Sequence, residues 1–491
     1  MRILYLDCDT LRADHLGCYG YVRDTSPNVD AVAKEGVRFN NCYVSDAPCL
    51  PSRSALFTGR FGIHTGVVGH GGTTADPFPE GSSRAFSRAF WAECDRLPWV
   101  SQLSRAGLHT VTVSPFAERH SAWWFYEGFA EMYNSGRGGL EVADEVTPLA
   151  LDWIKRHAKE DNWFLHVNHW DPHTPYRAPA GFGNPFAGKP LDGWYTEEIR
   201  RRHYESYGPH SAHEPLGWGG EENPYPRVPD EIGSMEDYRR WVDGYDVGIR
   251  YWDEHVGRIL AELERQGVLD DLVILISSDH GENLGELNIY GDHQTADHPT
   301  CRVPLIIRWP GVTRAGVDEG LRYQLDLAPT VTELAGGRCS AKWDGESFAA
   351  ELRRGGAGKG RGREYLVLSQ GAWSCQRGVR QEQWMMLRTY HDGMKDLAPT
   401  MLFDVETDPH ETRDLAGEKP EVVERLGRVL EEWERQMTGP AGREADPMWT
   451  VMREGGPFHT QGYLEGYLKR LRETGREQHA RALLARHGSG K

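Results

Sequence analysis

The chain has 491 residues, which is long for one compact domain and predicts a large domain with a smaller one. Lys and Arg total 56 against 73 Asp and Glu, a formal charge of −17. Such a surface repels nucleic acid and anionic membranes, so we expect neither as a partner. Any anionic ligand would need a local positive site, which a bound metal ion could supply.

The first residues, MRILYLDCD, read as a strand that starts at once. They show no basic stretch followed by an apolar stretch and a small-residue cleavage site, and no apolar run has transmembrane length. We therefore expect a cytoplasmic protein without a signal peptide. In that compartment the eight cysteines are free thiols, ligands or catalysts rather than disulfides.

Strands and helices alternate through the first two thirds of the chain. Strands are predicted at 3–9, 37–44, 163–168, 272–278 and 302–308, and helices at 26–36, 51–58, 142–160 and 237–266. This order predicts an α/β fold: a mostly parallel or mixed central sheet covered by helices on both faces. Ligands bind beyond the carboxyl ends of such strands, and Asp9 and Asp279 both follow strands, so we expect them on one rim.

The composition and the pattern of predicted elements change after residue 353. A Gly-rich basic stretch at 353–363 reads as a linker or loop. Strands follow at 365–369, 378–389 and 401–405, then a helix at 420–437. We predict a main domain at 1–365, a smaller α+β subdomain on an antiparallel sheet at 366–438, and a partly helical tail at 439–491.

The most informative stretch is 49–60, CLPSRSALFTGR. It matches the signature C-x-P-S-R-x-x-L-x-T-G-R at every defined position, and here the sequence resembles the formylglycine-dependent sulfatases of the alkaline phosphatase superfamily. The resemblance implies that a formylglycine-generating enzyme oxidises Cys49, and that Arg53 holds the resulting diol or a sulfate oxygen. The alternative, a buried structural cysteine beside a Pro-initiated helix, is disfavoured by so many fixed positions.

The chemistry of sulfate ester cleavage, which the resemblance implies, explains why these residue types are needed. A serine nucleophile would end as a stable sulfate ester, whereas the diol formed from formylglycine has a second hydroxyl that expels sulfate. A helix start offers backbone N–H groups and a positive dipole end to an anion.

Two further segments resemble the metal-binding segments of the family. Residues 279–282 (DHGE) follow an apolar strand, and residues 9–12 (DTLR) follow the first strand. Thr10 stands where many sulfatases carry a second Asp, and Asp7 is a less certain ligand whose alternative role is a salt bridge. Oxygen-rich sites suit calcium or magnesium, one nitrogen leaves manganese or zinc open, and the resemblance favours calcium. The predicted ligands are Asp9, Cys49, Asp279 and His280.

The substrate-binding residues depart more from the family pattern. Residues 171–176 (DPHTPY) resemble D-P-H-x-P-Y and make His173 a candidate general acid. His293 stands where the family carries a Lys before R-V-P, and His298 is a second candidate there. The family's G-K-W-H is missing, with Pro115 in place of its Lys. Arg119 and His120 follow and could replace it, or could be ordinary loop residues.

The resemblance covers residues 1–437 and implies a sulfuric ester hydrolase acting on a small anionic sulfated molecule, such as a sugar. The alternative is a phosphonate monoester or phosphodiester hydrolase, because such superfamily members also lack G-K-W-H. A binding protein without catalysis is disfavoured by the intact motif at Cys49. The tail, with His459, could cap the active site or a neighbouring subunit, which leaves a homo-oligomer open, although surface packing is the favoured interpretation.

Overall fold

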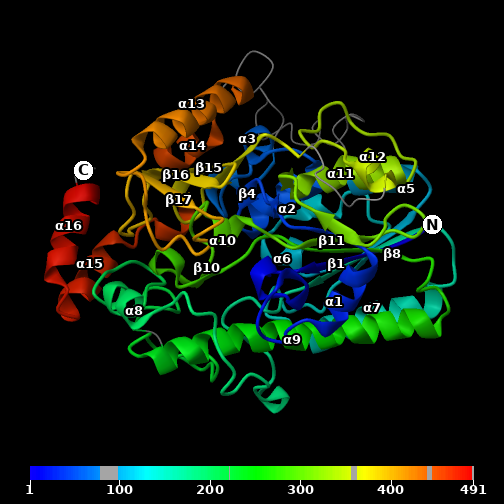
Figure 1. Ribbon diagram of the computed structural model, residues 1–491, viewed down its shortest axis with the longest axis horizontal. Helices are drawn as coiled ribbons and strands as arrows, with labels where there is room; N and C mark the ends of the chain where they lie inside the picture. The colour runs from blue at the N-terminus through cyan, green and yellow to red at the C-terminus, as the bar shows by residue number, and fades with distance from the viewer. Residues whose placement is uncertain (78–97, 221, 355–361, 439–444, 489–491) are drawn as a thin grey trace.

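The centre of the molecule is a mixed β-sheet (Figure 1). The computed structural model describes residues 1–77, 98–220, 222–354, 362–438 and 445–488. Within them the sheet has eight strands, in the spatial order β12 (Gly316–Asp318), β2 (Val37–Phe39), β11 (Leu305–Arg308), β8 (Val273–Ser278), β1 (Arg2–Cys8), β7 (Trp163–His169), β5 (His109–Val113) and β6 (Glu131–Tyr133). The strands from β8 to β6 are parallel, and β11 runs antiparallel to β8 and β2.

Alternate residues of β1 face two separate cores. Ile3 and Tyr5 pack into the core on one side of the sheet, and Leu4 and Leu6 pack into the core on the other side. This period of two explains why β1 is apolar throughout, since a strand covered on both faces has no solvent side.

Helices cover both faces of the sheet. On the lower face in Figure 1 lie α1 (Pro27–Glu35), α7 (Ala143–His157) and the long α9 (Met235–Arg265). On the upper face lie α2 (Cys49–Thr58), α5 (Trp99–Arg105) and α11 (Leu327–Leu334). None of the described helices is both long enough and apolar enough to cross a bilayer.

A second, antiparallel sheet forms the smaller part of the molecule. Its order is β17 (Thr400–Asp404), β16 (Trp384–His391), β15 (Cys375–Gln381), β14 (Tyr365–Gln370) and β4 (Asp46–Ala47). Helix α13 (Pro420–Met437) packs against it through Leu426, Leu430 and Trp433. Strand β4 lies just before Cys49 and pairs in parallel with β14, so the two parts of the chain are joined next to that residue.

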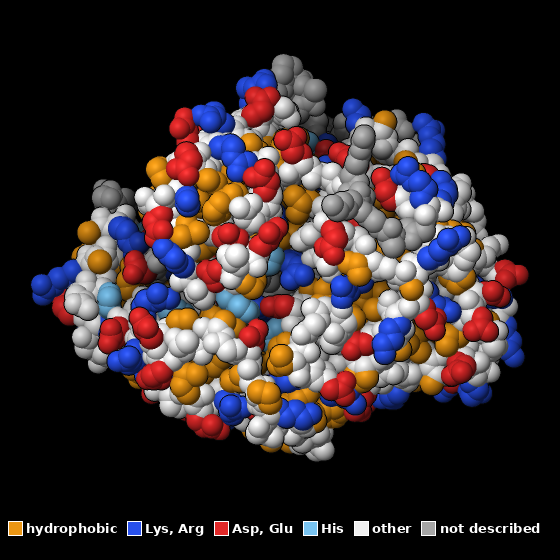
Figure 2. All heavy atoms as spheres, viewed as in Figure 1, with side chains coloured by type: hydrophobic (Ala, Val, Ile, Leu, Met, Phe, Trp, Pro, Cys, Tyr) orange, Lys and Arg blue, Asp and Glu red, His pale blue; other side chains and the backbone are white. Residues whose placement is uncertain are grey.

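The remaining described elements are short or lie in the tail. They are β3 (Cys42–Tyr43), β9 (Asn283–Leu284), β10 (Tyr290–Asp292), β13 (Arg322–Tyr323), α3 (Gly62–Thr65), α6 (Phe116–Arg119), α8 (Glu197–Tyr204), α10 (His298–Cys301), α12 (Ala349–Arg353), α14 (Pro447–Arg453), α15 (Leu464–Glu473) and α16 (Glu477–His487). Acidic and basic side chains are interspersed on the face seen in Figure 2, and histidines gather near its centre.

The predicted fold class is confirmed, with two differences in the elements. The strand expected at 378–389 is a hairpin of β15 and β16, which turns at Glu382 with a left-handed φ of 53°. No Gly, Pro or Asn marks that turn. The strand expected at 37–44 is broken into β2 and β3 at Asn40 and Asn41. Most of the expected linker at 353–363 lies outside the described residues.

Candidate active site

The carboxyl ends of β1, β7 and β8 meet at one edge of the sheet, as Cys8 pairs with both His169 and Ser278. The next residues on β1 and β8 are therefore neighbours: the backbone N–H of Thr10 donates to Oδ1 of Asp279 over 3.1 Å. Thr10 has a φ of 54°, which is strained for a β-branched residue and turns the chain sharply at this point. Asp9 and Asp279 are thus both brought to the rim that the strand pattern predicts.

Helix α2 brings Cys49 to the same rim. Cys49 is its first residue, every residue of the helix is buried, and Gly59 ends it with a left-handed φ of 66°. The hydroxyl of Ser52 donates to the backbone carbonyl of Asp279, which ties the first turn to the end of β8. Burial, followed by the Asp9 and Asp279 carboxylates, raises the pKa of the Cys49 thiol.

Arg53 lies among three buried carboxylates. Its guanidinium nitrogens are 3.1 Å from Asp7, 3.1 Å from Asp9 and 3.3 Å from Asp279. One guanidinium against three carboxylates leaves two negative charges uncompensated in a site without solvent, which is costly. Burial and the nearby Asp279 accordingly raise the pKa of Asp9. Oδ1 of Asp9 and Oδ2 of Asp279 also have no hydrogen-bond donor among the described residues, so a divalent cation fits this charge balance.

His280 completes an oxygen-rich cluster. Its Nδ1 lies 2.8 Å from the carbonyl of Gly281 and donates to it, so Nε2 keeps its lone pair. That Nε2 lies 3.2 Å from Sγ of Cys49 and 3.4 Å from Oδ2 of Asp279. A ring whose far nitrogen is held by a backbone carbonyl is the usual arrangement of a metal-binding histidine. One ligand atom from each of Asp9, Cys49, Asp279 and His280 lies within 4.8 Å of the others.

Gly281 is required by the close packing of this segment. A Cβ atom on it would lie 2.1 Å from the backbone carbonyl of Pro299, so any other residue would push His280 away from the cluster. This close contact explains why glycine occupies the third position of DHGE.

Cys49 lies at one side of a cavity of about 610 Å³. Four of the predicted substrate-contacting residues line this cavity as well, namely Arg119, His120, His173 and His293. The ring of His173 stacks on Trp170 at 5.4 Å between centroids, and the guanidinium of Arg119 lies 4.7 Å from the centre of the same indole. Trp170 is therefore a shared platform for His173 and Arg119.

Besides His280, two histidines of the cavity lining lie near the thiol: His173 and His293 each have a ring nitrogen within 4.8 Å of Sγ. Nδ1 of His173 lies 2.6 Å from the carbonyl of Thr174 and donates to it, which leaves Nε2 for the cavity. Burial, with Arg119 nearby, lowers the pKa of His173 to about 3. His293 is held by the second sheet, because Gln370 on β14 donates to its backbone carbonyl over 2.7 Å.

The structure does not bring His298 to this cavity. His298 is the first residue of α10, and its Nδ1 lies 2.9 Å from the hydroxyl of Tyr43. Its backbone N–H donates to Glu411 over 3.0 Å. The expectation that His298 contacts substrate is corrected accordingly: His298 begins α10, five residues after His293, and its ring lies against Tyr43 and does not line the cavity.

Other residues of the cavity wall were not proposed from the sequence as site residues, among them His70, His210, Asp292 and Trp373, and His459 was named only within a tail that could cap the active site. Asp292 precedes His293 and could have been proposed from that adjacency. Its carboxylate accepts from His210 at 2.9 Å and from Gln294 at 2.9 Å. His70, Trp373 and His459 come from three distant segments that show no motif. For His459 the interpretation as surface packing is wrong, since the residue faces the cavity.

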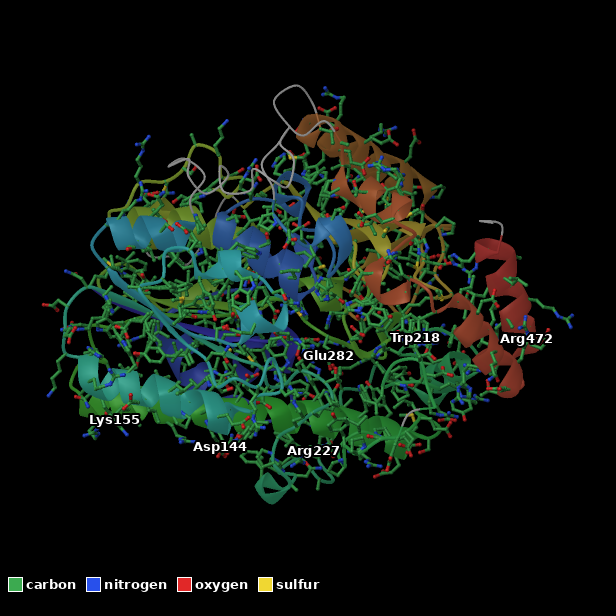
Figure 3. All side chains as sticks on the ribbon, turned by 180° about the vertical axis from the view of Figure 1, so that it is seen from behind. Asp144, Lys155, Trp218, Arg227, Glu282 and Arg472 are labelled. Carbon is green, nitrogen blue, oxygen red and sulfur yellow. The ribbon has the colours of Figure 1, made fainter. Side chains whose placement is uncertain are left out.

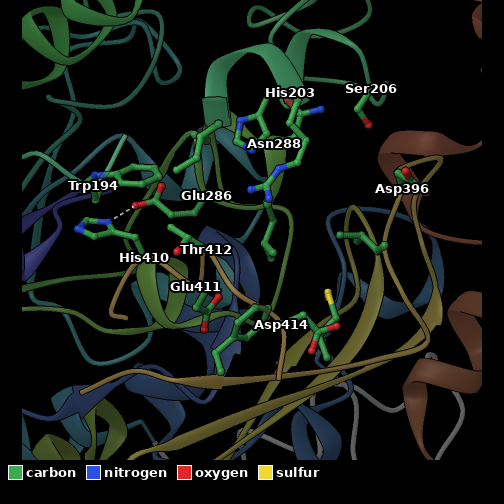
Figure 4. Close-up of a pocket in the computed structure, with 17 residues that line it drawn as sticks. Trp194, His203, Ser206, Glu286, Asn288, Asp396, His410, Glu411, Thr412 and Asp414 are labelled. Carbon is green, nitrogen blue, oxygen red and sulfur yellow. Dashed lines mark hydrogen bonds and ion pairs between the residues drawn. The ribbon is translucent and has the colours of Figure 1, made fainter. Parts of the chain in front are cut away.

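A second cavity, of about 280 Å³, lies between the segment after Trp194 and the second sheet (Figure 4). In it His410 stacks on Trp194 and lies 2.8 Å from Glu286. Glu286 in turn pairs with Arg12 at 2.8 Å. The Arg of DTLR is therefore held by this buried ion-pair cluster, away from the thiol.

Comparison with known family models covers residues 2–436 of the chain. The family model for sulfatases matches residues 2–337, and a model for the C-terminal part of N-sulphoglucosamine sulphohydrolase matches residues 285–436. Among curated proteins, an N-acetylglucosamine-6-O-sulfatase of Bacteroides thetaiotaomicron is 23% identical, with 89% of this chain and 86% of that protein covered. A choline-sulfatase of Rhizobium meliloti is 25% identical, with 80% and 77% covered.

Solved structures agree on the fold. A sulfatase solved with its substrate D-glucosamine-2-N,6-O-disulfate superposes with a TM-score of 0.68 at 20% identity, covering 89% of this chain and 97% of that one. A phosphonate monoester hydrolase of Silicibacter pomeroyi superposes with a TM-score of 0.66 at 20% identity, covering 89% and 95%. The matched models, together with the cluster around Cys49, show that this chain belongs to the sulfatase family and is an enzyme that hydrolyses sulfate esters.

Proposed function

We propose that the enzyme cleaves the sulfate ester of a small sulfated molecule, such as a sulfated sugar, with a formylglycine made from Cys49 and one divalent cation. The observation that carries this proposal is the place of Cys49. It is the first residue of a buried helix, beside His280, Asp9 and Asp279, and it opens onto the cavity.

The proposed nucleophile is the hydrated aldehyde of residue 49. One of its hydroxyls attacks sulfur, so that a new S–O bond forms while the S–O bond to the alcohol breaks and the alcohol leaves with a proton. The second hydroxyl then loses its proton and reforms the aldehyde, which breaks the C–O bond to the sulfate group and expels sulfate. The first turn of α2 offers backbone N–H groups to the anion, and Arg53 on the next turn keeps a positive charge directly behind it. A formylglycine-generating enzyme is the maturation partner that this chemistry requires.

The proposed metal ligands are Asp9, Asp279, His280 and the modified residue 49. Asp7, Asp9 and Asp279 place three carboxylates near Arg53, and such an oxygen-rich setting favours a hard cation. We propose calcium, with magnesium, manganese and zinc as alternatives. The cation lowers the pKa of the diol and neutralises charge on the sulfate group. Asp7 also lies 3.2 Å from His166, which supports an ion-pair role for it rather than ligation.

His173 and His293 are proposed to contact the sulfate and its leaving oxygen. Both flank residue 49, and both rings are fixed from behind, by Thr174 and by Asp292 at 3.4 Å. Arg119 and His120 are proposed to take the place of the family's G-K-W-H residues. His120 supports this with a buried Nε2 that has no hydrogen-bond partner among the described residues.

A phosphonate monoester or phosphodiester remains the second candidate substrate. His293 and Pro115 stand where the family usually carries lysines, and the fold superposes on a phosphonate monoester hydrolase. A phosphonate monoester and a sulfate monoester both carry one negative charge, so the single cation and Arg53 suit either. The relatives that match over most of the chain favour the sulfate ester.

The natural substrate is proposed to be a small imported molecule in the cytoplasm. A formal charge of −17 favours a small anion over a polyanion such as a sulfated polysaccharide. Two relatives, an N-acetylglucosamine-6-O-sulfatase and a choline-sulfatase, have names that give small substrates, and this supports a small substrate here.

The test compares two esters on one preparation. The protein is co-expressed with a formylglycine-generating enzyme, the mass of the Cys49 peptide is measured, and turnover of an aryl sulfate is compared with that of an aryl phosphonate monoester. We expect the mass of an aldehyde and faster sulfate turnover. Faster phosphonate turnover would replace the sulfate assignment and keep the site. An unmodified thiol in an active enzyme would contradict the proposed nucleophile.

A further inference from the structure

The C-terminal tail reaches the cavity above Cys49. Residues Phe458 and His459 line the cavity wall, although they lie beyond residue 436, where the matched family models end. The ring of Phe458 lies against Gly71, where a Cβ atom would be 2.1 Å from Phe458 Cδ2. The backbone of residues 70 and 71 is therefore shaped to receive the tail.

His459 is fixed by three contacts from two different segments. Its Nε2 lies 2.8 Å from Nδ1 of His70, its ring stacks on Trp373 at 4.6 Å, and its backbone N–H donates to Ala372 over 3.1 Å. A side chain held in this way presents a defined surface, which a specific binding site requires.

The pairing of His70 and His459 also decides which nitrogen faces the cavity. Nε2 of His70 lies 3.5 Å from the backbone N–H of Leu50, next to Cys49, and accepts from it. His70 therefore carries its proton on Nδ1 and donates to Nε2 of His459. His459 then carries its own proton on Nδ1, which has no hydrogen-bond partner among the described residues.

Aromatic rings connect this corner to the rest of the tail. Trp373 lies 6.4 Å from Trp218, and Trp218 stacks on Tyr463 of the tail at 4.6 Å with nearly parallel planes. Seen from behind in Figure 3, Trp218 lies between the body of the molecule and the tail helices, one of which carries Arg472. The row His459, Trp373, Trp218 and Tyr463 begins and ends in the tail, and its two middle rings belong to the body.

Ion pairs anchor the tail at both ends of this row. Arg476 pairs with the fully buried carboxylate of Glu214, and Asp446 pairs with Arg377 on β15 at 2.7 Å. The hydroxyl of Tyr467 accepts from the backbone N–H of Gly208 at 2.7 Å. Buried pairs of this kind make the tail a fixed wall of the cavity, since separating them would leave buried charges unpaired.

The part of the wall made of His70, Trp373 and His459 is polar and uncharged, and the charged side chains Arg119 and Asp292 lie elsewhere in the cavity lining. Burial, with His459 nearby, lowers the pKa of His70, and burial lowers the pKa of His459 to about 4, so both rings are neutral at pH 7. The nearest carboxylate, Asp292, is occupied by His210 and Gln294. The N–H on Nδ1 of His459, the one imidazole donor that the pairing with His70 leaves for a ligand, suits a hydroxyl group of a sugar, and the indole of Trp373 suits the apolar face of a sugar ring.

We propose that the C-terminal segment is the specificity element of this enzyme: His459, with Trp373 and His70, forms a subsite for the sugar ring that carries the sulfate ester. The proposal rests on the proposed function, because it assigns the alcohol half of the same ester.

The test measures steady-state constants of His459→Ala with N-acetylglucosamine 6-sulfate and with 4-nitrophenyl sulfate. A lost subsite contact should lower kcat/KM for the sugar ester by about tenfold or more, mainly through KM. The aryl ester should change by less than about threefold. Phe458→Ala should show the same pattern more weakly. His479→Ala is the matched control, since His479 lies in the same tail, contacts Glu205 and Tyr207, and does not line the cavity.

Equal losses on both esters, or no loss on the sugar ester, would overturn the proposal. So would a wild-type enzyme that hydrolyses the aryl ester but no sugar sulfate, or a His459 effect that is largest with choline sulfate. If the wild type hydrolyses neither ester, the proposed function fails by itself. Calorimetric binding of N-acetylglucosamine 6-sulfate to Cys49→Ala, with and without His459→Ala, then decides the subsite: weaker binding in the double variant supports it, and equal or absent binding overturns it.

Discussion

Sγ of Cys49 lies 3.2 Å from Nε2 of His280, although 231 residues separate the two in the chain. Cys49 is brought there by the start of α2 and His280 by the end of β8, and Ser52 joins the two through the carbonyl of Asp279. The nucleophile and the metal ligands are therefore set by the ends of regular elements, which hold them more precisely than loops would.

Replacing Cys49 should remove activity without unfolding the protein. Cys49→Ala deletes one buried sulfur and no charge, so we expect a loss in kcat of at least about 1,000-fold with a nearly unchanged Tm. Cys375→Ala is the control, because Cys375 is equally buried but lies on β15 outside the cavity. Residual activity of Cys49→Ala above a tenth of wild type would point to another nucleophile.

Replacing Arg53 should cost both stability and turnover. Arg53→Ala leaves Asp7, Asp9 and Asp279 without their cationic partner, which costs about 3–5 kcal/mol in the metal-free protein. Arg53→Lys keeps the charge but cannot reach three carboxylates at once, so it should recover stability more than activity. Thermal unfolding and turnover are measured for both variants, with the exposed Arg428→Ala as control. An unchanged Tm for Arg53→Ala would contradict this account of the cluster.

Removing divalent cations should lower the Tm as well as the activity. The two uncompensated negative charges beside Arg53 repel each other in the metal-free state, and a bound cation stabilises the folded protein by mass action. Unfolding is followed with a chelator and with added calcium, magnesium, manganese or zinc. Asp279→Asn should reduce the calcium-dependent rise in Tm. A Tm that no cation raises would show that the cluster does not bind one.

The stability contributed by His410 should disappear at high pH. Burial lowers its pKa, but hydrogen bonds to Asp192 and Glu286 outweigh this and raise it to about 9. The stabilisation, on the order of 3 kcal/mol, is therefore fully present below about pH 6.5 and is lost as the pH rises through 9. Urea unfolding of wild type and His410→Gln should differ at pH 6 and converge by about pH 9.5. A difference that is constant with pH would show that His410 is not charged in the folded protein.

The sequence was sufficient to predict the site residues that directly follow a strand or begin a helix. The apolar strands before Asp9 and Asp279 and the Pro-containing start of α2 are local patterns, and their meeting follows from the rule for the carboxyl edge of a parallel sheet. The Thr10 position illustrates the limit of this reasoning: the sequence shows a missing carboxylate, but its left-handed φ is visible only in the structure.

The far wall of the cavity could not be predicted, because it depends on long-range packing. His70, Trp373 and His459 lie in segments without periodicity, and they meet because the tail helices dock through Arg476 and Tyr467. Two histidines at sequence positions five apart, His293 and His298, diverge for a similar reason: α10 begins at His298 and directs it toward Tyr43. Counting back from the Arg of R-V-P gave His293, which lines the cavity, and the second candidate, His298, does not.

The most direct test of the central claim relates sulfate turnover to the state of Cys49. The enzyme is prepared with a series of formylglycine contents, by varying the co-expressed generating enzyme, and kcat for an aryl sulfate is plotted against the fraction of modified Cys49 peptide. A nucleophile made from Cys49 predicts a straight line through the origin. A rate that is independent of the modified fraction, or an active enzyme in which Cys49 is wholly unmodified, would contradict it.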